Sequence, residues 1–260
     1  MNRENIYGHH KKLNFILTAI RNFSIANSKK LTDIKVLDFG CGNGTAVSYQ
    51  IAGLGVLLTG IDLHQESIEF AEANNPFPKN AKFIYGNEDK VLDSSESFDI
   101  VVYSDIIEHL NEPQRVLKKI RQVHKDSGII IVAIPNGYGP FEIEKFISKY
   151  LKLEWLVNKL FGLASKCKKM IIRKSIKEEK QIPYNIQCKH VQFITIKSFR
   201  KLMENVGYRI LQMSNGAFLG APVSERFLRF EWFIDWNVKV ADKLPSQFVS
   251  TWYFVCEKMK

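Results

Sequence analysis

The sequence lacks any long hydrophobic run. Its longest apolar stretches, such as residues 129–134, are far shorter than the roughly 20 residues that a bilayer-spanning helix needs. Residues 1–12 also contain no apolar core ahead of a cleavage site, as a secretory signal would. We therefore expect neither an integral membrane protein nor a secreted one, and the expected location is the cytoplasm.

Cysteine is scarce as well. The four cysteines, Cys41, Cys167, Cys188 and Cys256, are scattered and form no Cys-x-x-Cys pair. This spacing argues against a structural zinc site and against a disulfide framework. We expect four reduced thiols.

Acidic residues are outnumbered by basic ones. The formal net charge is +10, and residues 145–180 alone hold eleven Lys and Arg against three Glu. With 45% hydrophobic side chains, the 260 residues can still bury a full core. The local excess of positive charge indicates an anionic partner or surface.

Strands and helices are predicted to alternate over the first half of the chain. A parallel sheet with helices on both faces is the fold that such alternation indicates, with right-handed crossovers. Short apolar runs predict strands at 34–39, 56–61, 82–85, 98–103 and 128–134, and helical spacing predicts helices at 13–23, 65–73 and 113–123, with another beginning near Gly44.

The alternation breaks after Gly139. Residues 140–187 are predicted to form an α-helical cap inserted over the sheet edge, and regular order resumes beyond them. We expect a single domain, 1–260, with a doubly wound Rossmann-like α/β fold of seven mostly parallel strands, the last antiparallel. The later elements are predicted as a helix at 195–206, a strand at 208–213, a helix at 225–243 and a strand at 250–257.

A glycine-rich loop, Asp38 to Gly44, follows the first predicted strand and opens a helix. Glycines there let the backbone come close to a ligand, although tight turns also use glycine for steric reasons alone. Open parallel sheets bind ligands beyond the carboxyl ends of their strands, where the strand order reverses. The position of this loop therefore predicts a ligand site.

Asp62 ends the second predicted strand, about 20 residues after the glycine loop. A carboxylate there can accept hydrogen bonds from both ribose hydroxyls of an adenosine ligand. The alternative is that Asp62 only caps the helix that starts near Gln65. Taken together with the glycine loop, Asp62 favours the adenosine interpretation.

Three segments together resemble the class I S-adenosylmethionine-dependent methyltransferases: Val-Leu-Asp-Phe-Gly-Cys-Gly-Asn-Gly, Gly-Ile-Asp-Leu and Ser-Phe-Asp-Ile-Val-Val-Tyr-Ser. Their order and spacing are similar over about residues 30–140 and, more loosely, 190–260. The resemblance implies S-adenosylmethionine as cofactor and S-adenosylhomocysteine as product, with Asp38 acting on the ammonium of the amino-acid end.

The resemblance also assigns the cofactor-binding residues. Adenine is expected against Leu63 and near Asn87, Glu88 and Asp89, and Ser104 is expected beside the methionine part. Lys12, with Tyr7, is expected to close over the cofactor, although surface solvation would explain either residue alone. The full set is Lys12, Asp38, Phe39, Gly40, Cys41, Gly42, Asp62, Leu63, Asn87, Glu88, Asp89 and Ser104.

A polar cluster, Asp105, Glu108 and His109, follows the fourth predicted strand. Asp-x-x-Glu-His is similar to the ubiquinone-pathway O-methyltransferases, whose matching side chains can bind a divalent metal. Asp105 replaces a longer glutamate there, so no metal ligand is assigned. A divalent metal such as magnesium, manganese or zinc is one alternative at this cluster, and without a metal His109 is a candidate general base. The alternative is an N-cap and first-turn acid pair for the helix after Pro113.

His190 is the second candidate base. It lies in a His-x-x-Phe-x-Thr run that resembles a run in related methyltransferases before the helix that resumes the fold. A histidine in a loop is more often a hydrogen-bonding brace. The catalytic candidates are Asp105, Glu108, His109 and His190.

The expected reaction is methyl transfer to a small-molecule or lipid-like acceptor, most often at oxygen. Apolar and lysine residues interleave in the cap, which favours either core packing or peripheral contact with an anionic membrane. No nucleic-acid module is recognisable. The alternatives are a catalytically silent cofactor-binding or adaptor domain, and RNA or protein methylation.

Overall fold

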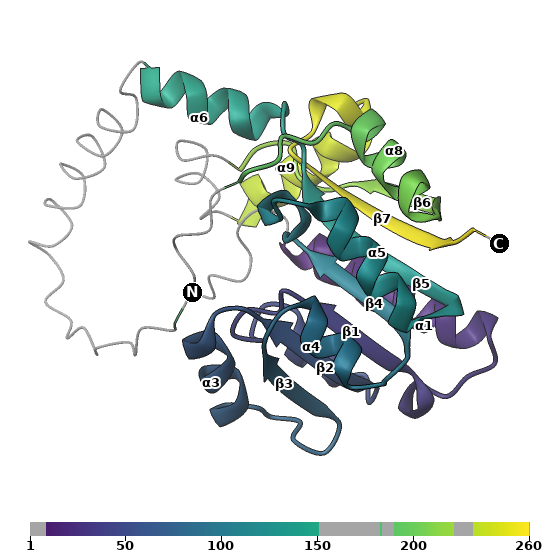
Figure 1. The fold of residues 1–260 in the computed structure, drawn as a ribbon. Coiled ribbons are helices and arrows are strands. Elements are labelled where there is room, and N and C mark those ends of the chain that lie inside the picture. Colours follow the sequence, from purple (N-terminus) through teal and green to yellow (C-terminus); the bar gives the residue numbers. More distant parts are fainter. Residues whose placement is uncertain (1–8, 151–182, 184–189, 221–230, 260) are drawn as a thin grey trace, which may run out of the picture.

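The computed structural model describes residues 9–150, 183, 190–220 and 231–259. Its centre is a seven-stranded sheet with the order β3-β2-β1-β4-β5-β7-β6 (Figure 1). β7 runs antiparallel to both of its neighbours. The Rossmann-like fold with an antiparallel last strand is therefore confirmed. The strands are β1 Lys35–Phe39, β2 Leu57–Asp62, β3 Ala81–Tyr85, β4 Phe98–Ser104, β5 His124–Pro135, β6 Tyr208–Asn215 and β7 Thr251–Lys258.

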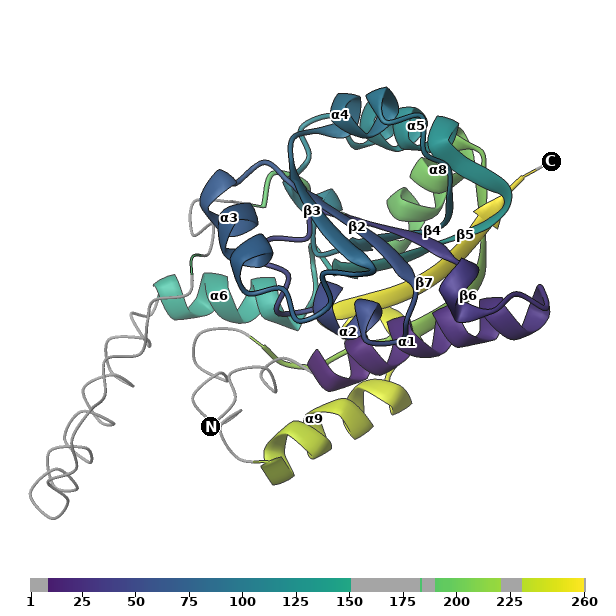
Figure 2. The same ribbon diagram turned by 90° about the horizontal axis from the view of Figure 1, so that it is seen from below.

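Helices cover both faces of the sheet. One buried cluster joins α4, α5 and α8 to one face, and a second joins α1, α2 and α3 to the other. Figure 2 shows α9 beside α1, where Lys11 forms an ion pair with Asp242. The helices are α1 His9–Ala26, α2 Ser48–Ala52, α3 Gln65–Ala73, α4 Glu88–Asp93, α5 Pro113–Val123, α6 Pro140–Tyr150, α8 Ile196–Val206 and α9 Glu231–Lys243.

The predicted helices and strands are compared here with those of the structure, and several have other boundaries than predicted. α3 and α5 have the predicted bounds, whereas α2 begins at Ser48, because the backbone between Gly44 and Val47 still turns. α1 begins earlier than predicted and brings His9 to Lys12 into the helix. The short helix α4 was not predicted, since six residues are too few to show a helical period.

The strand order reverses at β1, which pairs in parallel with β2 on one side and β4 on the other. Asp38 lies opposite both Gly60 and Val102. The carboxyl ends of β1, β2 and β4 therefore meet at one place, where doubly wound sheets bind their ligands.

Only part of the predicted cap can be compared with the structure. α6 forms where a cap helix was expected. Residues 151–182 and 184–189, which carry the lysine-rich stripe, Cys167 and Cys188, lie outside the described residues, as do Tyr7 and 225–230. Among the helices that are described, none combines the length and apolar character needed to cross a membrane. A single domain with a cap at 140–187 stays a prediction.

Candidate functional site

The glycine loop is a tight turn between β1 and α2. The amides of Gly40 and Cys41 both donate to the carbonyl oxygen of Ile61, at 2.8 and 3.0 Å. Gly40 has φ +81°, and a Cβ atom there would lie 2.5 Å from Cγ1 of Ile106. Glycine at this position therefore lets the loop pack against the turn that follows β4.

Gly42 is the loop residue with open space beside its Cα atom. Its φ is +54°, and a Cβ atom built there would meet nothing within 4 Å. Its amide donates to Oδ2 of Asp62 at 2.8 Å, while Oδ1 of Asp62 accepts from the amide of His64 at 2.8 Å. One carboxylate thus joins the loop to the end of β2.

The surroundings of Asp62 fit an adenosine ligand. His64, not Asp62, is the N-cap residue of α3, so helix capping does not account for Asp62. Each of its oxygens has a second lone pair beyond the backbone hydrogen bond. The neighbouring Leu63 is 68% exposed and offers an apolar surface for a base. Ribose and adenine binding at these residues stays a prediction.

Asp38 is buried beneath the loop. The hydroxyl of Ser48 donates to Oδ2 of Asp38 at 2.6 Å. Burial raises the pKa of the Asp38 carboxyl to about 6, and nearby Asp62 adds to the rise, whereas Ser48 and the charge of Lys12 oppose it. The hydrogen bond from Ser48 and the charge of Lys12 thus do not fully offset the cost of burying an ionised Asp38. A cationic ligand group, such as an ammonium bound beside the open loop, would stabilise the ionised carboxylate further.

Phe39 and Cys41 have limited means of contacting a ligand. The ring of Phe39 is buried and packs against Tyr103, with ring centroids 5.6 Å apart. Burial raises the pKa of the Cys41 thiol, and Asp38 and Asp62 raise it further, so the thiol stays protonated. Cofactor contacts of these two residues stay predictions that rest mainly on backbone atoms.

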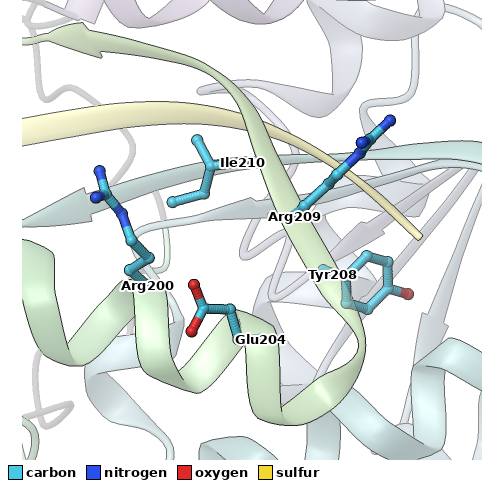
Figure 3. Close-up of a pocket in the computed structure, with 5 residues that line it drawn as sticks. All are labelled: Arg200, Glu204, Tyr208, Arg209 and Ile210. Carbon is cyan, nitrogen blue, oxygen red and sulfur yellow. The ribbon is translucent and has the colours of Figure 1, made fainter. Parts of the chain in front are cut away.

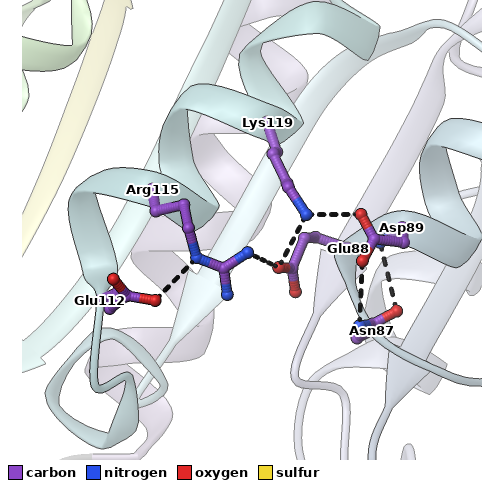
Figure 4. Close-up of polar contacts among 6 residues, drawn as sticks. All are labelled: Asn87, Glu88, Asp89, Glu112, Arg115 and Lys119. Carbon is purple, nitrogen blue, oxygen red and sulfur yellow. Dashed lines mark hydrogen bonds and ion pairs between the residues drawn. The ribbon is translucent and has the colours of Figure 1, made fainter.

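The predicted adenine residues at the start of α4 are engaged with α5 (Figure 4). Glu88 is buried and accepts from Arg115 at 3.0 Å and from Lys119 at 3.5 Å. Asp89 pairs with Lys119 at 2.5 Å, and Asn87 accepts from the Asp89 amide as the N-cap. The described partners of Glu88 and Asp89 thus hold α4 against α5, and their contact with adenine stays a prediction.

Lys12 forms an ion pair with the turn after β4. Its ammonium lies 2.5 Å from Oδ2 of Asp105, and its charge opposes the rise that burial causes in the pKa of both Asp38 and Glu108. Asp105 has φ +54°, a backbone conformation uncommon outside glycine. The hydroxyl of Ser104 lies 3.4 Å from the same oxygen. Lys12, Ser104 and Asp105 therefore border the site together.

Glu108 and His109 lie on the 3₁₀ turn η3 (Ile107–His109). The helix-cap alternative for these residues is wrong, because Glu112 is the N-cap residue of α5 and its first turn has no acidic residue. Burial raises the pKa of the Glu108 carboxyl, as does the nearby Asp105. A protonated or cation-bound carboxyl is the form that such burial favours.

His190 lies beside this turn although it is distant in sequence. The rings of His109 and His190 have centroids 5.0 Å apart. Nδ1 of His190 lies 3.3 Å from Oε1 of Glu142, a residue of α6 that the sequence analysis missed. Only a contact map would have indicated Glu142, because nothing in its local sequence marks it. Burial and the neighbouring His109 lower the pKa of His190, which favours the neutral ring.

The glycine loop also contacts one described residue of the predicted cap. The amide group of Asn43 donates to the carbonyl oxygen of Pro183 at 3.0 Å. Pro183, a residue of the predicted cap, therefore lies at the glycine loop.

A surface pocket of about 230 Å³ lies at the other edge of the sheet (Figure 3). It includes Tyr208 at the start of β6, opposite the carboxyl ends of β1 and β4. It is therefore separate from the site built here. Its lining residues are Arg200, Glu204, Tyr208, Arg209 and Ile210.

Comparisons with known proteins agree with this geometry. The chain is 29% identical over 138 residues to the ubiquinone biosynthesis O-methyltransferase of Pelagibacter ubique, covering 53% of this chain and 57% of that protein. It is 31% identical over 113 residues to the human mitochondrial ubiquinone biosynthesis O-methyltransferase, covering 42% and 30%. The chain thus matches about half or less of the length of these relatives.

Solved structures share the fold. The magnesium protoporphyrin IX methyltransferase of Synechocystis aligns with a TM-score of 0.53 at 14% identity, covering 96% of this chain and 83% of that one. A methyltransferase of Archaeoglobus fulgidus aligns with a TM-score of 0.53 at 15% identity and 93% coverage of each chain. The model of the methyltransferase domain family matches residues 8–213. The chain therefore belongs to this family and has the class I S-adenosylmethionine-dependent methyltransferase fold.

Proposed function

We propose that this chain transfers a methyl group from S-adenosylmethionine to a hydroxyl oxygen of a small-molecule or lipid-like acceptor. The observation that carries the proposal is the meeting of two different sites at the carboxyl edge of the sheet. The glycine loop and Asp62 suit an adenosyl ligand, and Glu108, His109 and His190 supply groups that take up a proton. Ile106, which precedes the η3 turn, packs against Gly40 of the loop.

Methyl transfer from S-adenosylmethionine needs little covalent catalysis by the protein. When bound, S-adenosylmethionine supplies a methyl group on a sulfonium, which is a good leaving group. The chain must align the acceptor oxygen with that methyl, exclude water and remove the hydroxyl proton. Asp38 and Asp62 would hold the cofactor, and the carboxylate and imidazole groups after β4 would receive the proton.

Oxygen is the proposed acceptor atom for two reasons. A hydroxyl needs deprotonation, and the cluster after β4 offers two imidazoles and a carboxyl group for it. Both relatives described above carry the name O-methyltransferase.

Peripheral membrane contact is part of the proposal, since α6 exposes Phe146, Ile147 and Tyr150. A cytoplasmic location is proposed as well.

Methyl transfer to a catechol tests this function. The purified chain is incubated with S-adenosylmethionine and a catechol that carries a hydrophobic tail. Mass spectrometry is expected to detect S-adenosylhomocysteine and a methoxy product in equal amounts. Binding of S-adenosylhomocysteine without turnover on any phenol or catechol would favour a silent binding domain. Methylation of RNA, with a steep salt dependence of RNA binding, would favour the other alternative.

Cofactor affinity is expected to fall as the pH falls below about 6. The ammonium of the cofactor favours ionised Asp38, so a protonated Asp38 must lose its proton on binding. The expected loss is up to about tenfold per pH unit, or about 1.4 kcal/mol. Calorimetry with S-adenosylhomocysteine from about pH 5 to about pH 8 measures it.

Ser48→Ala is the matched variant for this pH dependence. It removes the hydrogen bond that stabilises ionised Asp38, so the midpoint should move to higher pH. A dissociation constant independent of pH, or a midpoint that moves to lower pH, would contradict the role given to Asp38.

A further inference from the structure

We propose that Glu142 is a positioning residue for the methyl transfer proposed above, which orients the imidazole of His190 toward His109. The inference rests on the proposed function and deepens it, because it gives the helix α6 a part in proton uptake at the same site. Nδ1 of His190 and Oε1 of Glu142 form a hydrogen bond of 3.3 Å. The side chains of His190 and Glu142 are only 25% and 14% exposed, so water competes little for this contact.

The first turn of α6 is fixed to the sheet on both sides of Glu142. The amide of Phe141 donates to the hydroxyl oxygen of Ser250, the buried residue before β7, at 3.0 Å. The amide of Ile143 donates to the carbonyl oxygen of Gly139 at 3.1 Å, in the turn that follows β5. The ends of two neighbouring strands, β5 and β7, therefore set the position of Glu142.

The segment that carries His190 is fixed to the η3 turn. The amides of Val191 and Gln192 both donate to the carbonyl oxygen of Glu108, at 2.9 and 3.0 Å. The side-chain amide of Gln192 donates to the carbonyl oxygen of Leu110 at 3.3 Å. Backbone hydrogen bonds thus hold the His190 segment and the first turn of α6 independently, so the contact between their side chains needs little reordering of either.

The rings of His109 and His190 meet edge to face. Their centroids are 5.0 Å apart, and their planes are inclined by 67°. The hydrogen bond that one nitrogen of a histidine makes decides which nitrogen carries the proton. Donation from Nδ1 of His190 to Glu142 leaves Nε2 of the neutral ring as an acceptor. Glu142 therefore fixes a lone pair on His190 beside the ring that takes up the hydroxyl proton in our proposal.

A neutral His190 favours proton uptake by His109. In the proposed reaction the acceptor oxygen bonds to the methyl carbon, sulfur keeps the electron pair of the broken carbon–sulfur bond, and the hydroxyl proton goes to His109. The imidazolium that forms can donate to the Nε2 lone pair of His190, whereas a protonated His190 would repel it. Burial and the charge of His109 lower the pKa of His190, Glu142 opposes this change and Lys145 adds to it. The Glu142 carboxylate also polarises the ring, which makes His190 a better acceptor.

The ion pair between Glu142 and Lys145 does not account for this arrangement. The two groups are 3.8 Å apart at i and i+3 on α6, and the Lys145 side chain is 55% exposed. Such an exposed pair adds little to stability. Lys145 contacts Oε2 of Glu142, whereas His190 contacts Oε1, so the two contacts can be removed separately.

The tautomer of His190 tests the arrangement without any methyl transfer. The full chain is prepared with isotope-labelled histidine and followed by nitrogen NMR, and the signals of His190 are identified by their loss in His190→Gln. We expect a protonated Nδ1 and an unprotonated Nε2 on His190 in the unmodified chain. Glu142→Ala should lose this pattern in favour of a protonated Nε2 or of exchange between both tautomers.

Steady-state kinetics tests the role of Glu142 in the reaction. Glu142→Ala is expected to lower kcat by about 10-fold to 100-fold, the loss that corresponds to one charge-assisted hydrogen bond. KM for the acceptor and the dissociation constant of S-adenosylhomocysteine should stay within about threefold of the original values, since Glu142 contacts neither ligand in our proposal. Glu142→Asp, which keeps a carboxylate, should recover part of the lost kcat. Lys145→Gln, the matched control, removes the exposed partner of Glu142 and should change kcat less than about twofold.

Several results would overturn the proposal. One is a protonated Nε2 on His190 in the unmodified chain, and another is a tautomer that stays the same in Glu142→Ala. A loss confined to the acceptor KM would show that Glu142 only supports acceptor binding. Circular dichroism confirms that each variant is folded.

Failure of the positioning role and failure of the proposed function can be told apart. Methyl transfer to a hydroxyl with an unchanged kcat in Glu142→Ala would leave the function and remove the role of Glu142. No methyl transfer to any hydroxyl, with Nδ1 of His190 still protonated, would remove the function and leave only the contact between Glu142 and His190.

Discussion

Replacement of Asp62 by alanine is expected to weaken the binding of S-adenosylhomocysteine by about 100-fold or more. The carboxylate of Asp62 accepts from the amides of Gly42 and His64, and the remaining lone pairs are proposed to accept from the ribose hydroxyls. A hydrogen bond to a charged group contributes about 1.5–3 kcal/mol, so two of them correspond to about 3 kcal/mol or more. Each 1.4 kcal/mol is about tenfold in affinity.

Calorimetry measures this loss, with Glu66→Ala as the matched control. Glu66 is exposed on the first turn of α3, near Asp62 in sequence. Its replacement should leave the dissociation constant unchanged. Thermal unfolding checks that the Asp62→Ala variant remains folded. An unchanged dissociation constant in Asp62→Ala would remove the adenosine interpretation of this residue.

Replacement of His109 by glutamine is expected to lower kcat for O-methylation by about 10²-fold to 10⁴-fold, the range of general acid–base catalysis. The loss is expected because the ring of His109 is proposed to remove the hydroxyl proton. His109 lies on the η3 turn and is not one of the residues that bind the cofactor in our proposal. The dissociation constant of S-adenosylhomocysteine should therefore stay within about threefold of the original.

Steady-state kinetics and calorimetry on the same preparation separate a loss of kcat from a loss of cofactor affinity. His10→Gln is the control, because His10 is exposed near the start of α1. A kcat close to that of the unmodified chain would exclude His109 from the reaction. Equal losses in kcat and cofactor affinity would instead indicate general damage to the site.

The sheet was predictable from the sequence because its signals are local. Buried parallel strands appear as short apolar runs, and α3 and α5 were predicted with their observed bounds. The antiparallel β7 was also expected, because sheets of this kind commonly carry an antiparallel strand. α4 was missed because its six residues show no period. α1 was predicted too short, since its first turn carries the polar residues His9 to Lys12.

The glycine loop and Asp62 were predictable for the same reason, since both follow a strand directly. Contacts between segments that are distant in sequence were not predictable. Lys12 and Asp105 are 93 residues apart, and His190 and Glu142 are 48 apart. Their pairing depends on how α1 and α6 lie against the sheet. Glu108 was also open to interpretation as a helix cap, because the 3₁₀ turn on which it lies has no sequence marker.

The central claim is that the turn after β1 and the carboxylate at the end of β2 bind one adenosyl ligand. A crystal structure of the chain with S-adenosylhomocysteine tests it most directly. We predict the ribose within hydrogen-bonding distance of Asp62, adenine against Leu63, and the amino-acid end above Asp38. A ligand bound elsewhere, for instance in the pocket at Arg200 and Arg209, with the glycine loop empty at saturating ligand, would contradict the account.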